Sequence, residues 1–344
     1  MNIGTRAIGP DAPAFIIAEV AQAHNGDFDR ALAFVDALAA SGVDAVKFQT
    51  HLAACESSLD EPFRVSMGGP DATRFAYWQR MEFTEAQWRT LAKRCADQGV
   101  MFLSSAFSLE AVELLADIGM PAWKIGSGEF RSFELVEAMH KAGGPILLST
   151  GMSRFKDITA MVEQMRASDM PFVLFQCTSK YPTPLDEVGL NVLSEFRQRY
   201  ACPVGLSDHS GSVYPSLAAM AQGAEMIEVH AILEAGDAGV DAAASLVPAE
   251  FRMLADARDA FHAMRVAPVD KDEMAETLKE MRGLFSKSAA PARALSAGTV
   301  IEADMLVPRK PGTGVPFVDR NDIIGKTLIR DVVPEHVLKW SDVE

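Results

Sequence analysis

The feature that most constrains the fold is a regular alternation of short apolar segments with longer amphipathic ones. Eight of the apolar segments have the length and composition of strands. They are FIIAEVA (15–21), AVKFQT (45–50), VMFLSSAF (100–107), AWKIGS (122–127), ILLSTG (146–151), FVLFQCT (172–178), PVGLSDH (203–209) and MIEVHAIL (226–233). Helical patterns lie between them, as in residues 28–42 and 85–99. Strands that alternate with helices form parallel sheets, and strands this apolar are covered on both faces.

Eight strand–helix units within residues 1–266 predict an α/β protein with a (β/α)8 TIM barrel, a fold of about 250 residues. A doubly wound open sheet is the alternative. The first predicted strand is not followed by the G-x-G-x-x-G turn of dinucleotide-binding sheets, which weakens that alternative.

The pattern changes after residue 266. Residues 267–285 are highly charged, and they predict a linker that ends in a short helix. Residues 286–344 are rich in Gly and Pro turns between short apolar segments, and they predict a small β-rich domain. A domain this small is near the lower limit for independent folding, so we expect it to pack on another surface.

Composition excludes several classes of function. The net charge of −15 argues against nucleic acid as a partner. No apolar run approaches the roughly 20 residues that a membrane helix needs, and the first residues do not have the pattern of a secretory signal. Cys55, Cys95, Cys177 and Cys202 form no C-x-x-C pair, which favours reduced thiols and a cytoplasmic enzyme.

Polar side chains occur near the carboxyl end of every predicted strand, where the active site of such a barrel lies. Lys47 and Lys124 are each embedded in an apolar strand. A buried Lys needs a counter-charge, so each one either binds an anionic substrate or forms an internal ion pair. Alternate residues of a strand share a face, so Lys47 points the same way as Gln49.

Two ligand-type residues in one strand raise the prospect of a metal. Glu228 and His230 share a face of their strand, and His209 ends the preceding strand. Such a mixed nitrogen and oxygen set suits a divalent ion with open positions, whereas a single His at a strand end is more often a hydrogen-bonded structural residue. Together with the lysines, the set predicts a metal-assisted enzyme acting on an anion and a carbonyl.

Several motifs of the chain resemble, in order, those of the N-acetylneuraminate (sialic acid) synthase family. They are IIAEVAQAHNGDFDRA, DAVKFQTH, PAWKIGSGE, LLSTGMS, CTSKYPTP, GLSDHS and IEVHAIL. The tail PARALSAGTVIEADMLVPRKPGTGVP resembles the family's C-terminal antifreeze-like (SAF) domain. The resemblance covers nearly the whole chain.

The resemblance implies a condensation of phosphoenolpyruvate with an open-chain N-acylated hexosamine, giving a nine-carbon 2-keto sugar acid and phosphate. It implies Mn²⁺ or Mg²⁺ as cofactor, and a domain-swapped homodimer in which the small domain caps the partner's barrel. The implied metal ligands are His209, His230 and Glu228. The implied phosphoenolpyruvate contacts are Lys47, Ser105, Lys124, Ser127, Ser149, Ser179 and Ser207. The implied sugar contacts are Glu19, Gln49, Glu129, Tyr181, Asp241 and Lys310. Glu19, Glu129, Lys47 and Lys124 are the implied catalytic residues.

Departures from the family's pattern concentrate where the sugar is expected. Lys310 stands where relatives carry an Arg, and Lys cannot form the forked contact of a guanidinium. Ala235 and Val240 replace a basic residue and a Pro in the loop before Asp241. With the long connection 51–83, these changes point to a subgroup whose sugar differs from N-acetylmannosamine, such as the di-N-acetylated sugar of legionaminic acid synthesis.

Two other functions fit the residues. An aldolase would use Lys47 or Lys124 to form a Schiff base with its substrate. A non-catalytic sugar-binding barrel would bind its ligand without turnover. Desolvated charges of this kind usually serve chemistry, which favours an enzyme.

Overall fold

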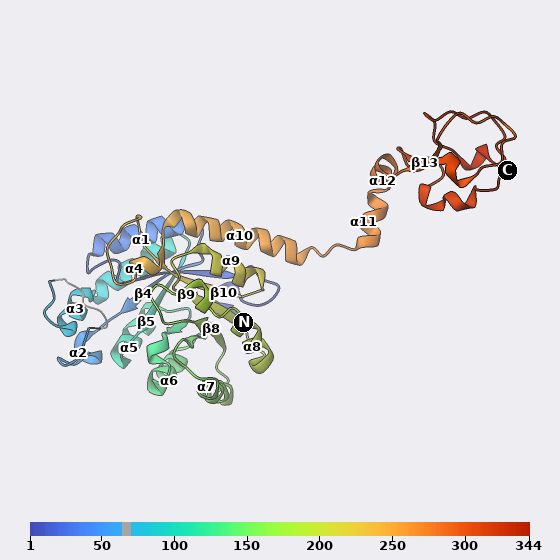
Figure 1. Ribbon diagram of the computed structural model, residues 1–344. Coiled ribbons are helices and arrows are strands. Elements are labelled where there is room, and N and C mark those ends of the chain that lie inside the picture. The colour runs from blue at the N-terminus through green and yellow to red at the C-terminus, as the bar shows by residue number, and fades with distance from the viewer. Residues whose placement is uncertain (64–69) are drawn as a thin grey trace. The chain divides into compact units, whose positions relative to one another are not determined.

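The computed structural model describes residues 1–63 and 70–344. The chain divides into two compact units, Met1–Val266 and Ala267–Glu344, which are coloured blue to orange and orange to red in Figure 1. Among the described residues, no helix combines the length and the apolar character needed to cross a membrane.

Eight parallel strands form the centre of the first unit, in the order β5-β4-β3-β10-β9-β8-β7-β6. They are β3 (Phe15–Ala21), β4 (Ala45–Thr50), β5 (Met101–Ala106), β6 (Trp123–Ile125), β7 (Ile146–Ser149), β8 (Phe172–Cys177), β9 (Val204–Asp208) and β10 (Met226–Ala231). The two end strands, β5 and β6, lie against each other, so the sheet nearly closes into a cylinder. The prediction of a TIM barrel is confirmed, and the doubly wound open sheet is wrong.

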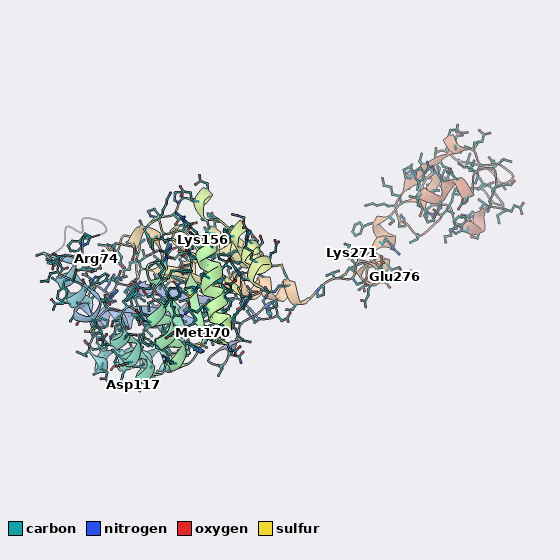
Figure 2. All side chains as sticks on the ribbon, turned by 90° about the horizontal axis from the view of Figure 1, so that it is seen from below. Arg74, Asp117, Lys156, Met170, Lys271 and Glu276 are labelled. Atoms are coloured by element: carbon teal, nitrogen blue, oxygen red, sulfur yellow. The ribbon has the colours of Figure 1, made fainter. Side chains whose placement is uncertain are left out.

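A helix follows each strand on the outside of the barrel (Figure 1). These helices are α1 (Phe28–Ala40), α4 (Glu85–Asp97), α5 (Leu109–Ile118), α6 (Phe133–Ala142), α7 (Phe155–Ala167), α8 (Asn191–Tyr200), α9 (Val213–Ala221) and α10 (Pro248–Val266). Figure 2 shows α7 on the outside of this unit, with Lys156 near its start and Met170 just beyond its end. Each helix buries one apolar stripe on the sheet, and every residue of β3 is buried between the barrel interior and that outer layer.

Local sequence sets the helix ends. The Asp27 side chain accepts a hydrogen bond from the backbone N–H of Arg30 at the start of α1. Thr84 and Gln87 form a reciprocal capping box at the start of α4. Gly119 ends α5 with a φ of 95°, a conformation that costs glycine little.

Smaller elements cover the two ends of the barrel. The hairpin of β1 (Asn2–Ile3) and β2 (Arg6–Ala7) packs near Met101, at the amino end of β5. Helices α2 (Ala53–Glu56) and α3 (Arg74–Met81) lie in the long connection between β4 and α4. Among its described residues, three 3₁₀ helices and a short strand complete this unit: η1 (Ser127–Glu129), η2 (Leu185–Glu187), η3 (Ala242–Ala244) and β11 (Ser245–Leu246), which pairs with β10.

The second unit has a core of its own, built from side chains that include Ala289, Ile301, Val315, Ile323 and Leu338. Its elements are α11 (Lys271–Thr277), α12 (Lys279–Phe285), β12 (Ser288–Pro291), η4 (Ala303–Met305), β13 (Leu306–Arg309), η5 (Phe317–Asp322) and η6 (Trp340–Asp342). The segment expected as a linker therefore contains two helices. The following residues contain less regular strand than the sequence predicts, because much of their backbone pairing is through isolated bridges and turns.

Candidate active site

A cavity of about 520 Å³ opens at the carboxyl ends of the barrel strands. Every site residue predicted within residues 1–266 lines it. They are Glu19, Lys47, Gln49, Ser105, Lys124, Ser127, Glu129, Ser149, Ser179, Tyr181, Ser207, His209, Glu228, His230 and Asp241. Lys310 belongs to the second unit, where its ammonium nitrogen lies 5.1 Å from the centre of the Phe285 ring, and its sugar contact stays a prediction.

Both predicted lysines are buried and paired with a carboxylate. The Lys47 ammonium donates to Glu19, which occupies the neighbouring position of β3. The Lys124 ammonium lies 3.5 Å from Glu228 Oε1 and donates to Ser149 Oγ at 2.7 Å. The internal ion pair weighed as an alternative is therefore present for each lysine, inside the cavity where an anion would bind.

Burial and the ion pairs together set the ionisation of the cavity. Burial raises the pKa of Glu19 to about 7, with the charge of Glu228 adding to the rise and Lys47 opposing it. Burial also opposes the charged form of Glu228, but Lys124 and Lys47 outweigh it and lower the pKa of that carboxyl. Burial lowers the pKa of Lys124, although the negative charge of Glu228 acts to raise it. Glu19 is therefore the carboxyl that changes charge near neutral pH.

Two imidazoles form the part of the cavity that suits a divalent metal. The ring centres of His209 and His230 are 5.3 Å apart, and the Tyr181 ring packs 4.2 Å from His209. His209 Nδ1 lies 3.0 Å from the carbonyl oxygen of Thr178, an orientation typical of a metal-binding His whose Nε2 is the ligand. Burial lowers the pKa of His230 to about 4, which keeps that ring in the neutral form that binds metals.

Cys177, predicted only as a reduced thiol, also reaches this region. Its sulfur lies 3.8 Å from His209 Nδ1. Burial opposes charge on both groups, yet the contact between them lowers the pKa of Cys177 and raises that of His209. A metal bound at His209 would have to displace the imidazole proton.

Glu228, the predicted third ligand, has other partners for one of its oxygens, and its role as a ligand stays a prediction. Its Oε1 faces Lys124 and lies 3.4 Å from Ser207 Oγ, while its Oε2 is buried without a hydrogen-bond partner. Across residues 1–63 and 70–344, no three His, Cys, Asp or Glu side chains are grouped closely enough to hold an ion. The residues present fit a metal held by two histidines, with its other positions left to substrate and water, and the metal itself stays a prediction.

Hydroxyl groups surround Gly151 beside the lysines. Its backbone N–H donates to Ser127 Oγ at 2.9 Å. A Cβ at this position would lie 2.5 Å from Ser179 Oγ and 2.9 Å from Ser127 Oγ, so only glycine leaves room for this cradle. Small hydroxyls and backbone N–H groups at this spacing can bind the oxygens of an anion.

The predicted sugar contacts line the same cavity. Gln49 Nε2 donates to Glu19 Oε1 at 3.0 Å. Glu129 lies on η1, where it accepts a hydrogen bond of 2.6 Å from Ser132 Oγ. These groups offer both donors and acceptors to the hydroxyl groups of a polyol.

The sequence analysis singled out the long connection 51–83 but named no residue of the cavity wall that this connection forms. The wall is formed by His51, Glu56, Glu61, Phe63, Arg74, Tyr77 and Trp78 from the β4–α4 connection, with Phe107 from the end of β5. Arg74 opens α3 at the edge of the barrel unit (Figure 2). The signal that could have located this wall was the length of the connection 51–83, because long ordered loops in compact domains are often functional. Residues 64–69 of that connection lie outside the described residues.

Comparisons with known proteins agree with this architecture. Residues 34–267 match the NeuB family, and residues 286–344 match the SAF domain. The chain is 30% identical to human N-acetylneuraminate-9-phosphate synthase, over 94% of this chain and 91% of the relative. It is 29% identical to the N,N'-diacetyllegionaminic acid synthase of Campylobacter jejuni, over 94% of this chain and 98% of the relative.

A solved structure extends the agreement to three dimensions. The N-acetylneuraminic acid synthetase of Leptospira borgpetersenii superimposes with a TM-score of 0.71 at 27% identity, covering 82% of this chain and 97% of that one. The matched family model spans most of the barrel, and both relatives match over more than nine-tenths of each chain. The chain therefore belongs to the NeuB family, a family of C–C bond-forming synthases, and it ends in an SAF domain.

Proposed function

We propose that the chain condenses phosphoenolpyruvate with the open-chain form of an N-acylated hexosamine, yielding a nine-carbon 2-keto sugar acid and phosphate. The observation that carries the proposal is the convergence of Lys47, Lys124 and the hydroxyl cradle around Gly151 on the cavity that also contains His209 and His230. The names of the relatives, which are synthases of sialic and legionaminic acids, support a nonulosonic acid as the product.

The two lysines are placed to bind the anionic enol phosphate. Its phosphate and carboxylate need cations, and Lys47 and Lys124 are both buried in the cavity. Ser127, Ser149 and Ser179 would complete the anion site through their hydroxyls. Desolvation strengthens each of these contacts relative to the same contact in water.

Glu19, Gln49 and Glu129 would orient the sugar so that its aldehyde carbon meets C3 of the enol phosphate. The new C–C bond turns the aldehyde oxygen into an alkoxide and leaves positive charge at C2. A water molecule adds at C2 and its proton neutralises the alkoxide, after which the intermediate loses phosphate by cleavage of its C–O bond. Mn²⁺ or Mg²⁺ bound at His209 and His230 would supply Lewis-acid polarisation of the aldehyde.

A phosphate-release assay with phosphoenolpyruvate and Mn²⁺ tests the proposal across a panel of mono- and di-N-acylated hexosamines. Release that depends on one of these sugars supports it, and no release with any of them would overturn it. In ¹⁸O-labelled water the label should enter the 2-keto acid, because the C–O bond breaks. Label in the phosphate would contradict this route.

We also propose a cytoplasmic homodimer in which the SAF domain caps the partner's barrel, with Lys310 contacting the sugar. The four cysteines are free thiols, which supports a reducing compartment. Sedimentation should give the mass of two chains. Lys310→Ala should raise the KM for the sugar and leave that for phosphoenolpyruvate unchanged, whereas equal effects on both would argue against the cap.

A Schiff-base aldolase remains a second candidate, because the burial that lowers the pKa of Lys124 favours a nucleophilic amine. Borohydride treatment in the presence of a keto acid distinguishes the two reactions. The synthase should lose no activity in this treatment, whereas the aldolase would be trapped as a covalent adduct of the lysine.

A further inference from the structure

His51 lies in a stack of aromatic rings at the side of the cavity, just after β4. Its ring centre is 3.8 Å from that of Trp78 and 4.4 Å from that of Phe107, with interplanar angles of 19° and 8°. The guanidinium of Arg74 covers the Trp78 ring at 4.8 Å. Rings stacked on both faces hold the imidazole in one plane, so only its two nitrogen edges can interact with other groups.

Both edges of the His51 ring meet polar groups. Nδ1 lies 2.6 Å from Glu56 Oε1, and this carboxylate fixes the outer edge. Nε2 lies 3.2 Å from Gln49 Oε1 and 3.3 Å from Gln22 Nε2. The Glu56 carboxylate accepts from Nδ1–H, so Nε2 accepts from the Gln22 nitrogen when the ring is neutral and donates to the Gln49 oxygen when both ring nitrogens carry a proton. Gln22 also donates to the Gln49 oxygen, so the ring is connected to Gln49 in both states.

The chain of contacts continues to the carboxyl group expected to act on the sugar. A carboxylate only accepts hydrogen bonds, so the Gln49 amide must present Nε2 to Glu19, as it does at 3.0 Å. The amide oxygen of Gln49 then faces His51 and also accepts from Gln22. An amide that rotated by half a turn would lose its contacts on both sides.

We propose that His51 is a positioning residue, which holds the Gln49 amide and through it the Glu19 carboxylate in one orientation for the condensation. The inference rests on the proposed function, because it assigns the work at the sugar to Glu19. The long β4–α4 connection thereby has a definite role. Trp78 and Glu56 fix the imidazole, which is connected to Glu19 through Gln49, either directly or by way of Gln22.

The variant His51→Phe tests this role, because it keeps an aromatic ring in the stack and removes both nitrogens. We expect kcat to fall about 10- to 100-fold, the effect of a misplaced catalytic group, with the KM for phosphoenolpyruvate unchanged. The pH at which kcat/KM reaches half its maximum should also move upward, because Glu19 loses the hydrogen bond that favours its charged form. Loss of ring packing alone would not move the pH profile.

Further variants separate positioning from packing. His51→Gln places an amide near the position of Nε2 and should restore part of kcat. In a protein that already carries Gln49→Ala, His51→Phe should cause no further fall in kcat, because the connection between His51 and Glu19 is then already broken. Should His51→Phe not fold, Glu56→Ala interrupts the same chain at its outer end and must shift the pH profile in the same direction.

The outcomes distinguish the two proposals. If the wild-type protein releases no phosphate with any sugar of the panel, the proposed function fails and the role of His51 fails with it. If the wild-type protein is active and His51→Phe matches it in kcat and pH profile, only the role of His51 is overturned. An effect of His51→Phe that adds fully to that of Gln49→Ala would overturn it as well.

Discussion

The Lys124 ammonium lies 3.5 Å from Glu228 Oε1, and both side chains are less than a tenth exposed. Their strands, β6 and β10, are not neighbours in the sheet, so the ion pair crosses the interior of the barrel. A lysine or a glutamate is rarely buried without such a partner. The pair therefore leaves neither buried charge without a partner and keeps a cation inside the cavity.

Removing one partner of this pair should cost stability. Lys124→Met leaves Glu228 buried without its cation, and we expect a loss of roughly 3 kcal/mol in the free energy of unfolding, measured with urea. The double variant with Glu228→Gln should regain much of that loss, because no uncompensated charge remains. Neither variant should bind phosphoenolpyruvate well. A double variant no more stable than Lys124→Met would contradict the ion pair.

Buried His24 should make stability depend on pH. Burial lowers the pKa of His24 to about 4 from its ordinary value of 6.5. The neutral ring contributes stability that is fully present above pH 6.5 and is lost as the pH falls toward 4. The share of this loss due to His24 should approach about 3 kcal/mol, measured as the difference between the wild type and His24→Asn in the change of unfolding free energy from pH 7.5 to pH 4.

A non-titrating side chain should remove this dependence. His24→Asn can keep an acceptor for the Gly26 N–H, which now donates to His24 Nδ1 at 3.1 Å, but it loses contact with the Phe83 ring. We expect lower stability at pH 7.5 and a flatter pH profile. The same change at exposed His336 is the control and should leave the profile unaltered.

Gly151 should be irreplaceable in the hydroxyl cradle. The methyl group of Gly151→Ala would collide with Ser179 and Ser127, and we expect at least a ten-fold higher KM for phosphoenolpyruvate together with a loss of about 1–3 kcal/mol. Gly128 also lines the cavity, but a Cβ there meets nothing within 4 Å. Gly128→Ala is therefore the matched control. An equal effect of the two substitutions would contradict the role of the hydroxyl groups around Gly151 in binding phosphoenolpyruvate.

A metal held by His209 and His230 alone, as proposed above, makes a prediction that a three-ligand site does not. His230→Ala should lower the affinity for Mn²⁺ at least ten-fold, measured by calorimetry without substrate. Glu228→Gln should change that affinity only a few-fold, because its carboxylate faces Lys124 and Ser207. Equal losses in the two variants would restore Glu228 as a ligand. Chelator should abolish phosphate release, and added Mn²⁺ should restore it.

Much of the fold was readable from local pattern. The segments 15–21 and 45–50 are strands with the predicted bounds, and the others differ from prediction by a few residues at their ends. Continuous apolar runs predicted the strands, and the amphipathic segments between them predicted the helices. The second unit was harder to read, because its backbone pairing depends on contacts between distant residues, as in the isolated bridge between Leu295 and Val332.

By itself, the sequence determined which side chains of the barrel strands enter the cavity. Alternate residues of a strand share a face, and the carboxyl ends of parallel strands meet at one end of a barrel, so Lys47, Lys124, His209 and His230 could be assigned to one site. Only the tertiary structure decided what each of them contacts. Glu228 pairs with Lys124 across the barrel, and His51 is held between Trp78 and Phe107, because these contacts depend on strand order, loop path and side-chain rotamers that no local pattern encodes.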